Sequence, residues 1–263
     1  MTPFTLLDLR QRQRRRLLPL LAGLLLLLPL VFLLGLSATT SDPFDPADAG
    51  AFLAVSALAM QFVAMALLAP IGAADRFSRE FEQRTIDALL NSPATPARIF
   101  GGKYLAALVF ALFLWALFLP PIAFAALWGG YPAWNYALFA LANLLVGAYL
   151  TLLALSASAR SQRALHSFLR LGACFILFLV LLPTLASLLM AGSNPDAPPT
   201  LLAWPFLAPN PFILHFWLLD VFSNARHALR YPLGPWFLPS VLLAWLLLSL
   251  LSFRLALRSL RPR

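Results

Sequence analysis

The sequence predicts an all-α polytopic membrane protein with six transmembrane helices, and three observations lead to this fold class. Of the 263 residues, 61% are hydrophobic and only 11% are charged, whereas about a quarter of the residues in soluble domains are charged. Uncharged apolar runs of roughly twenty residues recur along the chain, which is the length that a helix needs to cross a bilayer. A transmembrane barrel would instead require shorter segments of alternating polarity.

The six predicted spans contain no Asp, Glu, Lys or Arg, and they cover residues 17–37, 51–72, 104–127, 136–158, 171–192 and 237–253. If residues 1–16 lie in the cytosol, 17 of the 19 basic residues lie on the inner side, and only Arg226 and Arg230 lie outside. The positive-inside rule therefore predicts that both termini are cytosolic. The net charge of +9 follows from this topology and suits contact with anionic lipid, so we do not expect nucleic-acid binding.

The N-terminal residues 1–16 are amphipathic and basic, and we expect them to lie on the inner membrane surface with their arginines toward the headgroups. An Arg-rich start before a Leu-rich run is also typical of a secretory signal peptide. The apolar run over residues 17–37 is longer than such a signal usually is, and no clear cleavage site follows it promptly. We therefore expect an uncleaved first span, and a single six-helix transmembrane domain over residues 17–263.

The region before the last span has two interpretations, because residues 197–219 are uncharged and numerous enough to form a seventh span. A seventh crossing would move the four C-terminal arginines to the outer side, against the positive-inside rule. Five prolines between residues 198 and 211 also oppose a continuous helix through lipid. We therefore prefer an outer re-entrant or interfacial element over residues 197–230.

Residues 75–103 form a long charge-dense segment between the second and third spans. Five apolar side chains recur there at helical spacing: Phe77, Phe81, Ile86, Leu89 and Leu90. Because polar side chains cover the other side, the pattern predicts an amphipathic helix over residues 79–90. Ser92-Pro93 is expected to end it, since the residue before a proline avoids the α region. Thr95 is then the predicted N-cap, and Pro96 the first residue, of the helix that leads into the third span.

The sequence contains no recognisable catalytic, metal-binding or nucleotide-binding pattern. There is no His-Glu-x-x-His or Gly-x-Ser-x-Gly, and the single cysteine, Cys174, excludes an intrachain disulfide. Gly101-Gly102-Lys103 continues with Tyr104 and does not follow a predicted strand, so it is not a phosphate-binding loop. We therefore expect this chain not to be an enzyme and to bind no cofactor or metal of its own.

Gln61 and Asn143 are the more notable polar side chains within the predicted spans. We expect both amides to form hydrogen bonds between helices, with contact to a transported substrate as the alternative. Ion-coupled carriers usually keep ionisable residues at membrane depth, and the predicted spans have none. Sodium sites made of backbone carbonyls nevertheless leave an ion-coupled carrier as one functional alternative.

The charge-dense segment resembles the cytosolic signature of membrane subunits of type-2 ATP-binding-cassette (ABC) transporters. That signature runs E-x-G-T-hydrophobic-(D/E)-x-L-L-x-(S/T)-P and is followed by G-K at the mouth of the third span. The matching residues are Glu82, Thr85, Ile86, Asp87, Leu89, Leu90, Ser92, Pro93, Gly102 and Lys103. Arg84 stands where the family has glycine, and arginine favours continuation of a helix that glycine would loosen. Further along the chain, Asn210-Pro211-Phe212 is similar to the family's outer element before the last span.

The resemblance implies that the segment is a coupling helix seated in a groove of a separate ATPase subunit. Its ATPase-coupling residues would be Phe81, Glu82, Thr85, Ile86, Asp87, Leu89, Leu90, Ser92 and Pro93, and the third span would start at Pro96, Gly102 and Lys103. An amphipathic helix can place its apolar stripe in such a groove. Acidic residues on the same helix favour a protein partner over the anionic inner leaflet. Lys103 is expected to anchor the third span at headgroup level.

The function implied is that of a permease subunit of an ABC transporter, with export as the expected direction. The chain would pair with a second copy or a related permease half, contact membrane lipid, and leave ATP and Mg to the ATPase subunit. Its expected location is the plasma or inner membrane of a bacterial cell. A non-transporting membrane scaffold or assembly factor that recruits a soluble partner is the alternative from another functional class.

Overall fold

The computed structural model describes residues 20, 23–24, 27, 46–128, 133–190, 207–211 and 237–260. Within these ranges every regular element is a helix. The expected N-terminal segment 1–16, nearly all of the first span 17–37 and most of the outer element 197–230 lie outside the described residues.

Four helical stretches among the described residues are long and apolar enough to cross a membrane. They are Gly50–Ile71, Pro96–Leu127, Trp134–Ala159 and Pro239–Ser259. These stretches coincide with the predicted spans 51–72, 104–127, 136–158 and 237–253. The all-helical, multi-span part of the fold prediction is therefore confirmed for the described residues.

The spans are built from segments with different hydrogen-bonding patterns. The second predicted span is formed by α3 (Pro46–Val63), the π-helix η1 (Ala64–Leu68) and α4 (Ala69–Ile71), and the third by α7 (Pro96–Leu117) and α8 (Leu119–Trp128). The fourth is α9 (Ala133–Ala159), and the last is α14 (Phe237–Ser259). The fifth predicted span, 171–192, falls on α10 (Ala164–Ile176), η2 (Leu177–Leu181) and α11 (Leu182–Met190).

A π turn precedes a proline at the same spacing in two of these helices. The N–H of Ala69 bonds to the carbonyl of Ala64 just before Pro70, and the N–H of Leu182 bonds to that of Leu177 just before Pro183. A proline has no N–H to donate, and its ring crowds the preceding turn of a helix. The wider π turn makes room for the ring, which explains why both interruptions lie beside a proline.

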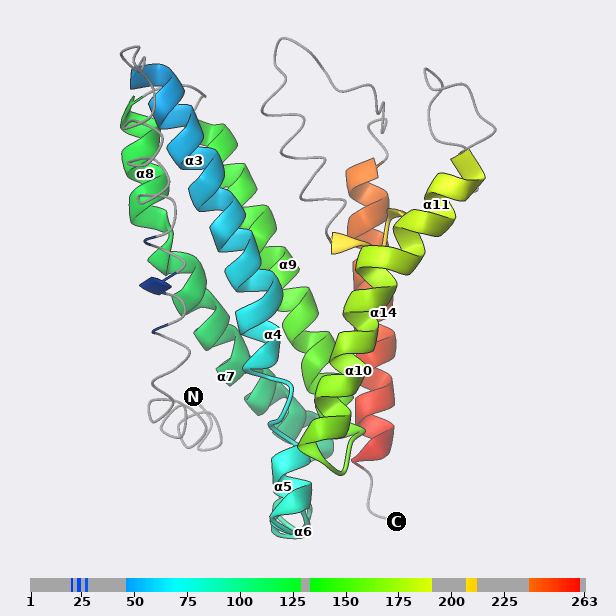
Figure 1. The fold of residues 1–263 in the computed structure, drawn as a ribbon. Helices are drawn as coiled ribbons and strands as arrows, with labels where there is room; N and C mark the ends of the chain where they lie inside the picture. Colours follow the sequence, from blue (N-terminus) through cyan, green and yellow to red (C-terminus); the bar gives the residue numbers. More distant parts are fainter. Residues whose placement is uncertain are drawn as a thin grey trace.

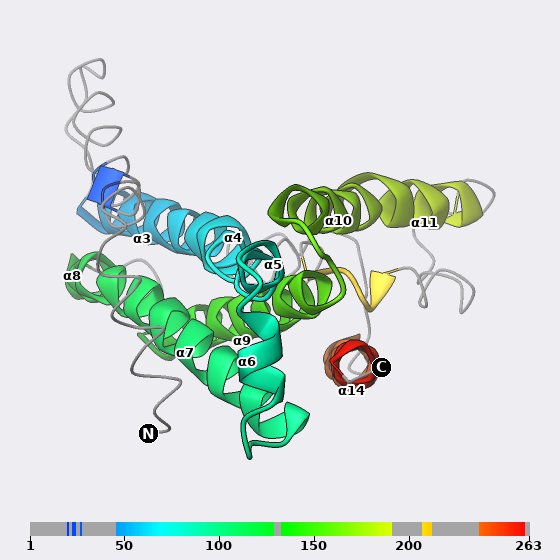
Figure 2. The ribbon, with the colours of Figure 1, turned by 90° about the horizontal axis from the view of Figure 1, so that it is seen from below.

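The helix α9 is the centre of the bundle, since it packs against α3, α7, α10 and α14. In Figure 1, α3 and α8 run side by side at one edge, and α14 lies on the opposite side of α9. The chain α10–η2–α11 leans outward toward its upper end (Figures 1 and 2). The two short helices α5 (Ser78–Glu82) and α6 (Ile86–Leu90) project from the lower end of the bundle as drawn in Figure 1.

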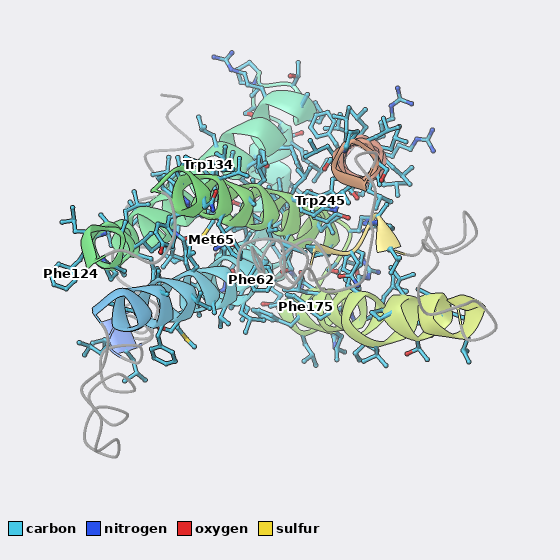
Figure 3. The ribbon with its side chains drawn as sticks, turned by 90° about the horizontal axis from the view of Figure 1, so that it is seen from above. Phe62, Met65, Phe124, Trp134, Phe175 and Trp245 are labelled. Atoms are coloured by element: carbon cyan, nitrogen blue, oxygen red, sulfur yellow. The ribbon has the colours of Figure 1, made fainter. Side chains whose placement is uncertain are left out.

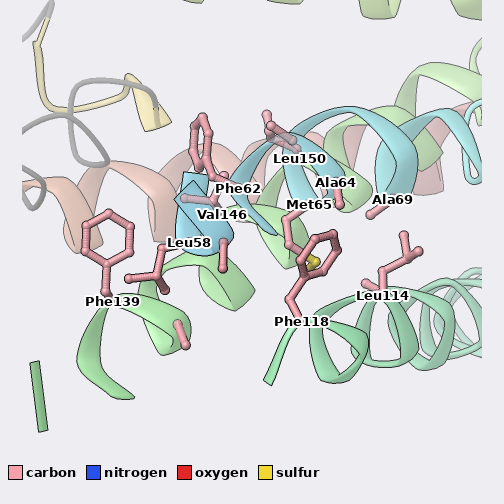
Figure 4. Close-up of a cluster of buried hydrophobic side chains, with 14 of the residues drawn as sticks. Leu58, Phe62, Ala64, Met65, Ala69, Leu114, Phe118, Phe139, Val146 and Leu150 are labelled. Carbon is pink, nitrogen blue, oxygen red and sulfur yellow. The ribbon is translucent and has the colours of Figure 1, made fainter. Parts of the chain in front are cut away.

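Two clusters of buried apolar side chains hold the helices together. The upper cluster joins α3, η1, α7, α8 and α9, and Figure 4 shows Met65 beside Phe118 and Leu58 beside Phe139 within it. Met65 faces Gly147 of α9, where an added Cβ would lie 2.2 Å from the Met65 Cε atom. A larger residue at position 147 would therefore have to displace Met65, and glycine permits the close approach of the two helices.

The lower cluster lies where α5 and α6 meet the ends of the long helices. Its buried members are Ala73, Ala74, Phe77, Ile86, Ile99, Phe100, Ala107, Leu152, Ala154, Leu155, Ala159, Leu171, Ala256 and Leu260. These residues come from α6, α7, α9, α10, α14 and the turn after α4. The lower cluster therefore packs the short helices onto the spans.

Large apolar side chains also cover the outside of the spans, as is usual for helices that face lipid rather than water. Seen from above, Phe124 and Trp134 lie at the outer edge, whereas Met65 and Trp245 lie among the helices (Figure 3). Leu127 of α8 is 84% exposed. In water such exposure would be an aggregation hazard, and in a bilayer it is the expected outer surface.

Asn210 connects the described part of the outer element to the fifth helical chain. In the π register of η2 the carbonyl of Phe178 would accept a hydrogen bond from residue 183, and that residue is Pro183, which has no N–H. The Asn210 side-chain amide donates to this carbonyl instead, at 2.5 Å, and Asn210 is fully buried. Asn210 therefore donates to the Phe178 carbonyl the hydrogen bond that Pro183 cannot donate.

We expect Asn210→Leu to lower the stability of the protein by about 1–3 kcal/mol, because the Phe178 carbonyl would be buried without a donor. Thermal unfolding in detergent can be followed by labelling of the single cysteine, Cys174, which is half-buried. Adding Pro183→Ala to the same chain should restore much of the loss, since the new N–H can serve the carbonyl. An unchanged unfolding midpoint for Asn210→Leu alone would contradict this account.

Candidate functional site

The candidate site is the connection between α4 and α7, residues 72–95, called here the α4–α7 connection. It contains α5 and α6, each five residues long, which lie beyond the ends of the other helices (Figures 1 and 2). The prediction of one helix over residues 79–90 is therefore wrong. The helix is interrupted at residues 83–85, and its two halves point in different directions (Figure 2).

The interruption is a Schellman motif with Arg84 at its left-handed position. Arg84 has a φ of 57°, its N–H bonds to the Phe81 carbonyl at 3.2 Å, and the Thr85 N–H bonds to the Glu80 carbonyl at 3.0 Å. This pair of bonds ends a helix through a residue in the left-handed region, which is usually glycine. The expectation that arginine would continue the helix is thus not met, because helix propensity is worth only a few tenths of a kcal/mol per residue.

The apolar side of the two short helices faces the protein's own lower cluster. Ile86 is only 6% exposed, and Phe81, Leu89 and Leu90 are half-buried against that cluster. The apolar stripe was predicted to lie in a partner's groove. In this structure the side chain of Ile86 is instead covered by the lower cluster of the same chain. The exposed residues of the connection from position 82 onward are Glu82, Gln83, Arg84, Thr85, Asp87, Ala88, Asn91, Pro93 and Thr95. Its outward surface is consequently polar.

The end of α6 and the start of α7 follow the local sequence signals. The helix α6 ends at Leu90, and the Ser92 hydroxyl donates to the Leu89 carbonyl at 2.7 Å. Thr95 is the N-cap of α7, its hydroxyl oxygen accepts a hydrogen bond from the Arg98 N–H at 3.3 Å, and Pro96 is the first residue. The predicted stop at Ser92-Pro93 and the restart at Thr95-Pro96 are both confirmed.

A buried ion pair joins α7 to α5. The Nζ atom of Lys103 lies 2.5 Å from Oε1 of Glu80 and 5.1 Å from the centre of the Phe77 ring. Lys103 is only 6% exposed, and its neighbour Gly102 is also buried. Lys103 therefore lies inside the protein at the lower end of the bundle, and its predicted position at headgroup level stays a prediction. Its charge is neutralised inside the lower end of the bundle by a carboxylate and an aromatic face.

Further hydrogen bonds hold the turn between α4 and α5. The Arg76 guanidinium donates to the carbonyls of Gly72 and Lys103, at 3.4 and 3.0 Å. The Nε atom of Arg79 forms an ion pair with Oδ2 of Asp75 at 2.7 Å. The buried Asp75 is therefore paired with a cation within the connection, and the buried Arg76 guanidinium has backbone acceptors in the connection and at α7.

Serines from two neighbouring helices satisfy the backbone of the same turn. The Ser158 hydroxyl of α9 accepts hydrogen bonds from the N–H groups of Phe77 and Ser78, at 3.0 and 3.1 Å. Ser167 of α10 donates to the carbonyl of Ala74. Because Ser158 lies about eighty residues away from its partners along the chain, it acts as a cap supplied by a different helix.

Glu82 of the connection in turn caps the N-terminus of α10. Its Oε1 atom accepts a hydrogen bond from the Ala164 N–H at 2.8 Å, at the start of α10, whose own N-cap residue, Arg163, makes no side-chain cap. A carboxylate at a helix N-terminus is favourable for both its hydrogen bond and the helix dipole. The α4–α7 connection is therefore tied to α10 as well as to α7 and α9.

The corner between α9 and α10 is itself well bonded. Arg170 donates to the Arg160 carbonyl at 2.6 Å and to the Ser161 hydroxyl at 3.1 Å. Burial, and then the neighbouring Arg170 cation, lower the pKa of the Arg160 guanidinium. The end of α14 joins the same region, since the Ser259 hydroxyl donates to the Ala159 carbonyl at 3.1 Å. The lower end of the bundle thus forms one braced unit.

Gln61 and Asn143 belong to a different part of the molecule, on α3 and α9. The Asn143 amide donates to the Leu58 carbonyl and to Oε1 of Gln61, each at 3.0 Å, and the Gln61 amide donates to the Trp115 carbonyl of α7 at 3.0 Å. Both residues are fully buried. The expected hydrogen bonding between helices is confirmed, and neither side chain is presented to a substrate in this conformation.

The sequence did not indicate that Ser158, Ser167 and the Glu80–Lys103 pair belong to this site. Small polar residues at the end of an apolar span do not reveal which distant backbone groups they satisfy. The opposite charges of Glu80 and Lys103 were visible, but not that they are neighbours in space. Among the described residues, no cluster of His, Cys, Asp and Glu is arranged to hold a metal ion.

We expect Lys103→Met to destabilise the protein by about 2 kcal/mol, because the Glu80 carboxylate would lose its cation in a partly buried position. Arg98→Met is the matched control, since Arg98 is exposed in the first turn of the same helix. The measurement is the unfolding midpoint in detergent for both variants. Equal midpoints would show that the buried pair does not stabilise the connection.

We expect Arg84→Gly to stabilise the protein by about 1 kcal/mol, because glycine adopts a left-handed backbone conformation without a steric penalty. For a chain of this size the unfolding midpoint should rise by about 2–4 °C. Arg84→Val should lower it, since a β-branched residue is disfavoured at positive φ. A lower midpoint for the glycine variant would show that the arginine side chain stabilises the isolated chain.

Comparison with known proteins agrees with the architecture described above. A protein family described as "ABC-2 family transporter protein" matches residues 11–180, more than half of the chain and including the whole α4–α7 connection. Among curated proteins, none matches the sequence. The chain therefore belongs to the ABC-2 family of transporter proteins, and it is a multi-pass membrane subunit of the permease type.

Proposed function

We propose that the chain is the permease subunit of an ATP-driven exporter, and that a separate ATPase subunit binds the exposed tip of its α4–α7 connection. Membership of the ABC-2 family implies an ABC ATPase partner in general terms. The tip consists of the exposed residues between positions 82 and 93. We assign the contact to this polar surface rather than to the apolar stripe, because the stripe packs on the lower cluster.

The observation that carries the proposal is the convergence of three ties on one short segment. Glu80 pairs with Lys103 of α7, Glu82 caps α10, and the start of α5 is capped by Ser158 of α9. A displacement of the tip would therefore move the ends of three long helices together. That is the mechanical property required of a device that passes the movement of an ATPase to the membrane domain.

The proposed arrangement in the membrane follows the charge distribution. Six spans with both termini in the cytosol would place the α4–α7 connection on the inner side, where an ATPase can reach it, in the inner or plasma membrane of a bacterial cell. Because six spans make half of a transport pathway, the chain would pair with a second copy or a related permease half. ATP and Mg would bind the partner, and this chain would perform no hydrolysis.

The direction of transport rests on the resemblance of residues 82–103 to the type-2 signature. The uncharged spans suit an apolar cargo, such as a lipid or a hydrophobic peptide, better than an ionic one. The scaffold alternative predicts recruitment of a partner without nucleotide hydrolysis. The two functions are therefore separated by whether the bound partner hydrolyses ATP.

The test is to purify the tagged full-length chain from its native membrane in mild detergent and to measure ATP hydrolysis in the eluate. We expect an ATPase subunit to co-purify with it. We expect Ala88→Trp to reduce the recovered ATPase activity at least about tenfold, because the larger side chain would block contact between α6 and the ATPase subunit. Ala88 is exposed, whereas Leu89 is half-buried against the lower cluster. A substitution at Leu89 would therefore disturb folding as well as binding.

The matched control is Ala97→Trp, an exposed alanine in the first turn of α7, which should leave the recovered activity nearly unchanged. Recovery of the wild-type chain with a partner that does not hydrolyse ATP would favour the scaffold. Recovery of ATPase activity that is equally high with Ala88→Trp would move the docking site away from α6.

A further inference from the structure

Arg84 occupies a backbone position that its own chemistry opposes. Its φ of 57° lies in the left-handed region, which costs an L-residue with a Cβ atom roughly 1–2 kcal/mol. Glycine would end α5 through the same two hydrogen bonds without that cost. Strained residues persist where another interaction offsets the strain, and they cluster at functional positions.

The offsetting interaction is not found within the described part of the chain. Arg84 is exposed, and its guanidinium has no hydrogen-bond or ion-pair partner among the described residues. The other charges of α5 and the turn before it are engaged: Asp75 with Arg79, Glu80 with Lys103, and Glu82 with the Ala164 N–H.

The remaining acidic side chain of the tip, Asp87, lies in the first turn of α6, where the helix dipole favours it. Arg84 therefore presents the outward-facing cation of the α5–α6 turn. A guanidinium at such a position is suited to a planar carboxylate, with which it can form two parallel hydrogen bonds.

The location of the turn favours a protein partner over lipid headgroups. Arg84 joins α5 to α6, and these two helices lie beyond the ends of α7, α9 and α10 (Figure 1). The apolar surfaces that face lipid lie along the spans instead, for example at Leu127. A cation held past the helix ends is placed to meet a soluble subunit that covers the lower end of the bundle.

We propose that Arg84 is a specificity-determining contact for the ATPase subunit, and that it pairs with an Asp or Glu side chain in an acidic groove of that subunit. The inference rests on the proposed function and names the chemistry of the partner's surface. It explains why an arginine stands at a left-handed position: the side chain contributes to the complex, although the backbone is strained in the isolated chain.

The experiment compares full-length Arg84→Gly, Arg84→Lys and Arg84→Glu with the wild-type chain. Each is purified in detergent, and ATP hydrolysis in the eluate is measured as NaCl is raised from about 0.15 M, where charge pairs are already partly screened. We expect Arg84→Glu to retain at least about tenfold less ATPase activity than wild type. Arg84→Gly should release the ATPase at lower salt than wild type, and Arg84→Lys should fall between them.

The control for net charge is Arg258→Glu, an exposed arginine in the last turn of α14, which should behave as wild type. Because Arg84→Gly is expected to raise the unfolding midpoint, a weaker complex with that variant cannot be a folding defect. The same glycine substitution should thus stabilise the isolated chain and weaken the assembly, which a merely structural arginine would not do.

Two results would overturn the inference while leaving the proposed function intact. One is a wild-type chain that recovers ATPase activity with a salt dependence unchanged by Arg84→Glu. The other is a loss of activity that appears only when anionic phospholipid is added to the detergent, which would assign Arg84 to lipid headgroups. Absence of ATPase activity with the wild-type chain would instead count against the proposed function itself.

Discussion

The buried pair of Lys103 and Glu80 determines where the α4–α7 connection can lie. Lys103 is placed by the apolar helix α7, and in that setting its ammonium group needs an anion close by. Glu80 supplies it from α5 at 2.5 Å, so α5 is held against α7. Once α5 is there, its first N–H groups meet Ser158, its last residue reaches α10, and Ile86 enters the lower cluster. The packing of the lower end follows from neutralising one cation.

The parts of the fold that depend on local sequence were predictable, and those that depend on distant partners were not. Span length and hydropathy located four membrane-length helices, and Thr95-Pro96 located the start of α7. The positive-inside rule predicts the inner side of the membrane for Lys103, but it does not predict that the side chain is buried against α5. Its partner Glu80 lies 23 residues earlier in the sequence, and no periodicity reports such a contact.

Helical periodicity identified the apolar stripe of α5 and α6 correctly but could not say what would cover it. A stripe of this kind can pack on the same chain or on another, and the two cases have the same sequence pattern. Here the lower cluster covers it. The residues of the connection therefore divide into an inward set, such as Ile86, which packs on the chain itself, and an exposed set around Arg84 and Asp87, to which we assign the proposed contact with a partner subunit.

The hydrogen bonding of the bundle also separates rigid from compliant parts. The connection is tied to α7, α9 and α10 by side chains, whereas the spans above it contain the π turns η1 and η2. At each π turn a following proline removes a donor, so the helix has fewer bonds resisting a bend there. At η2 the missing bond is replaced by Asn210 from the outer element. In the proposed transporter, a displacement of the tip would therefore bend the chain more readily at η1 than at η2, where Asn210 replaces the missing bond.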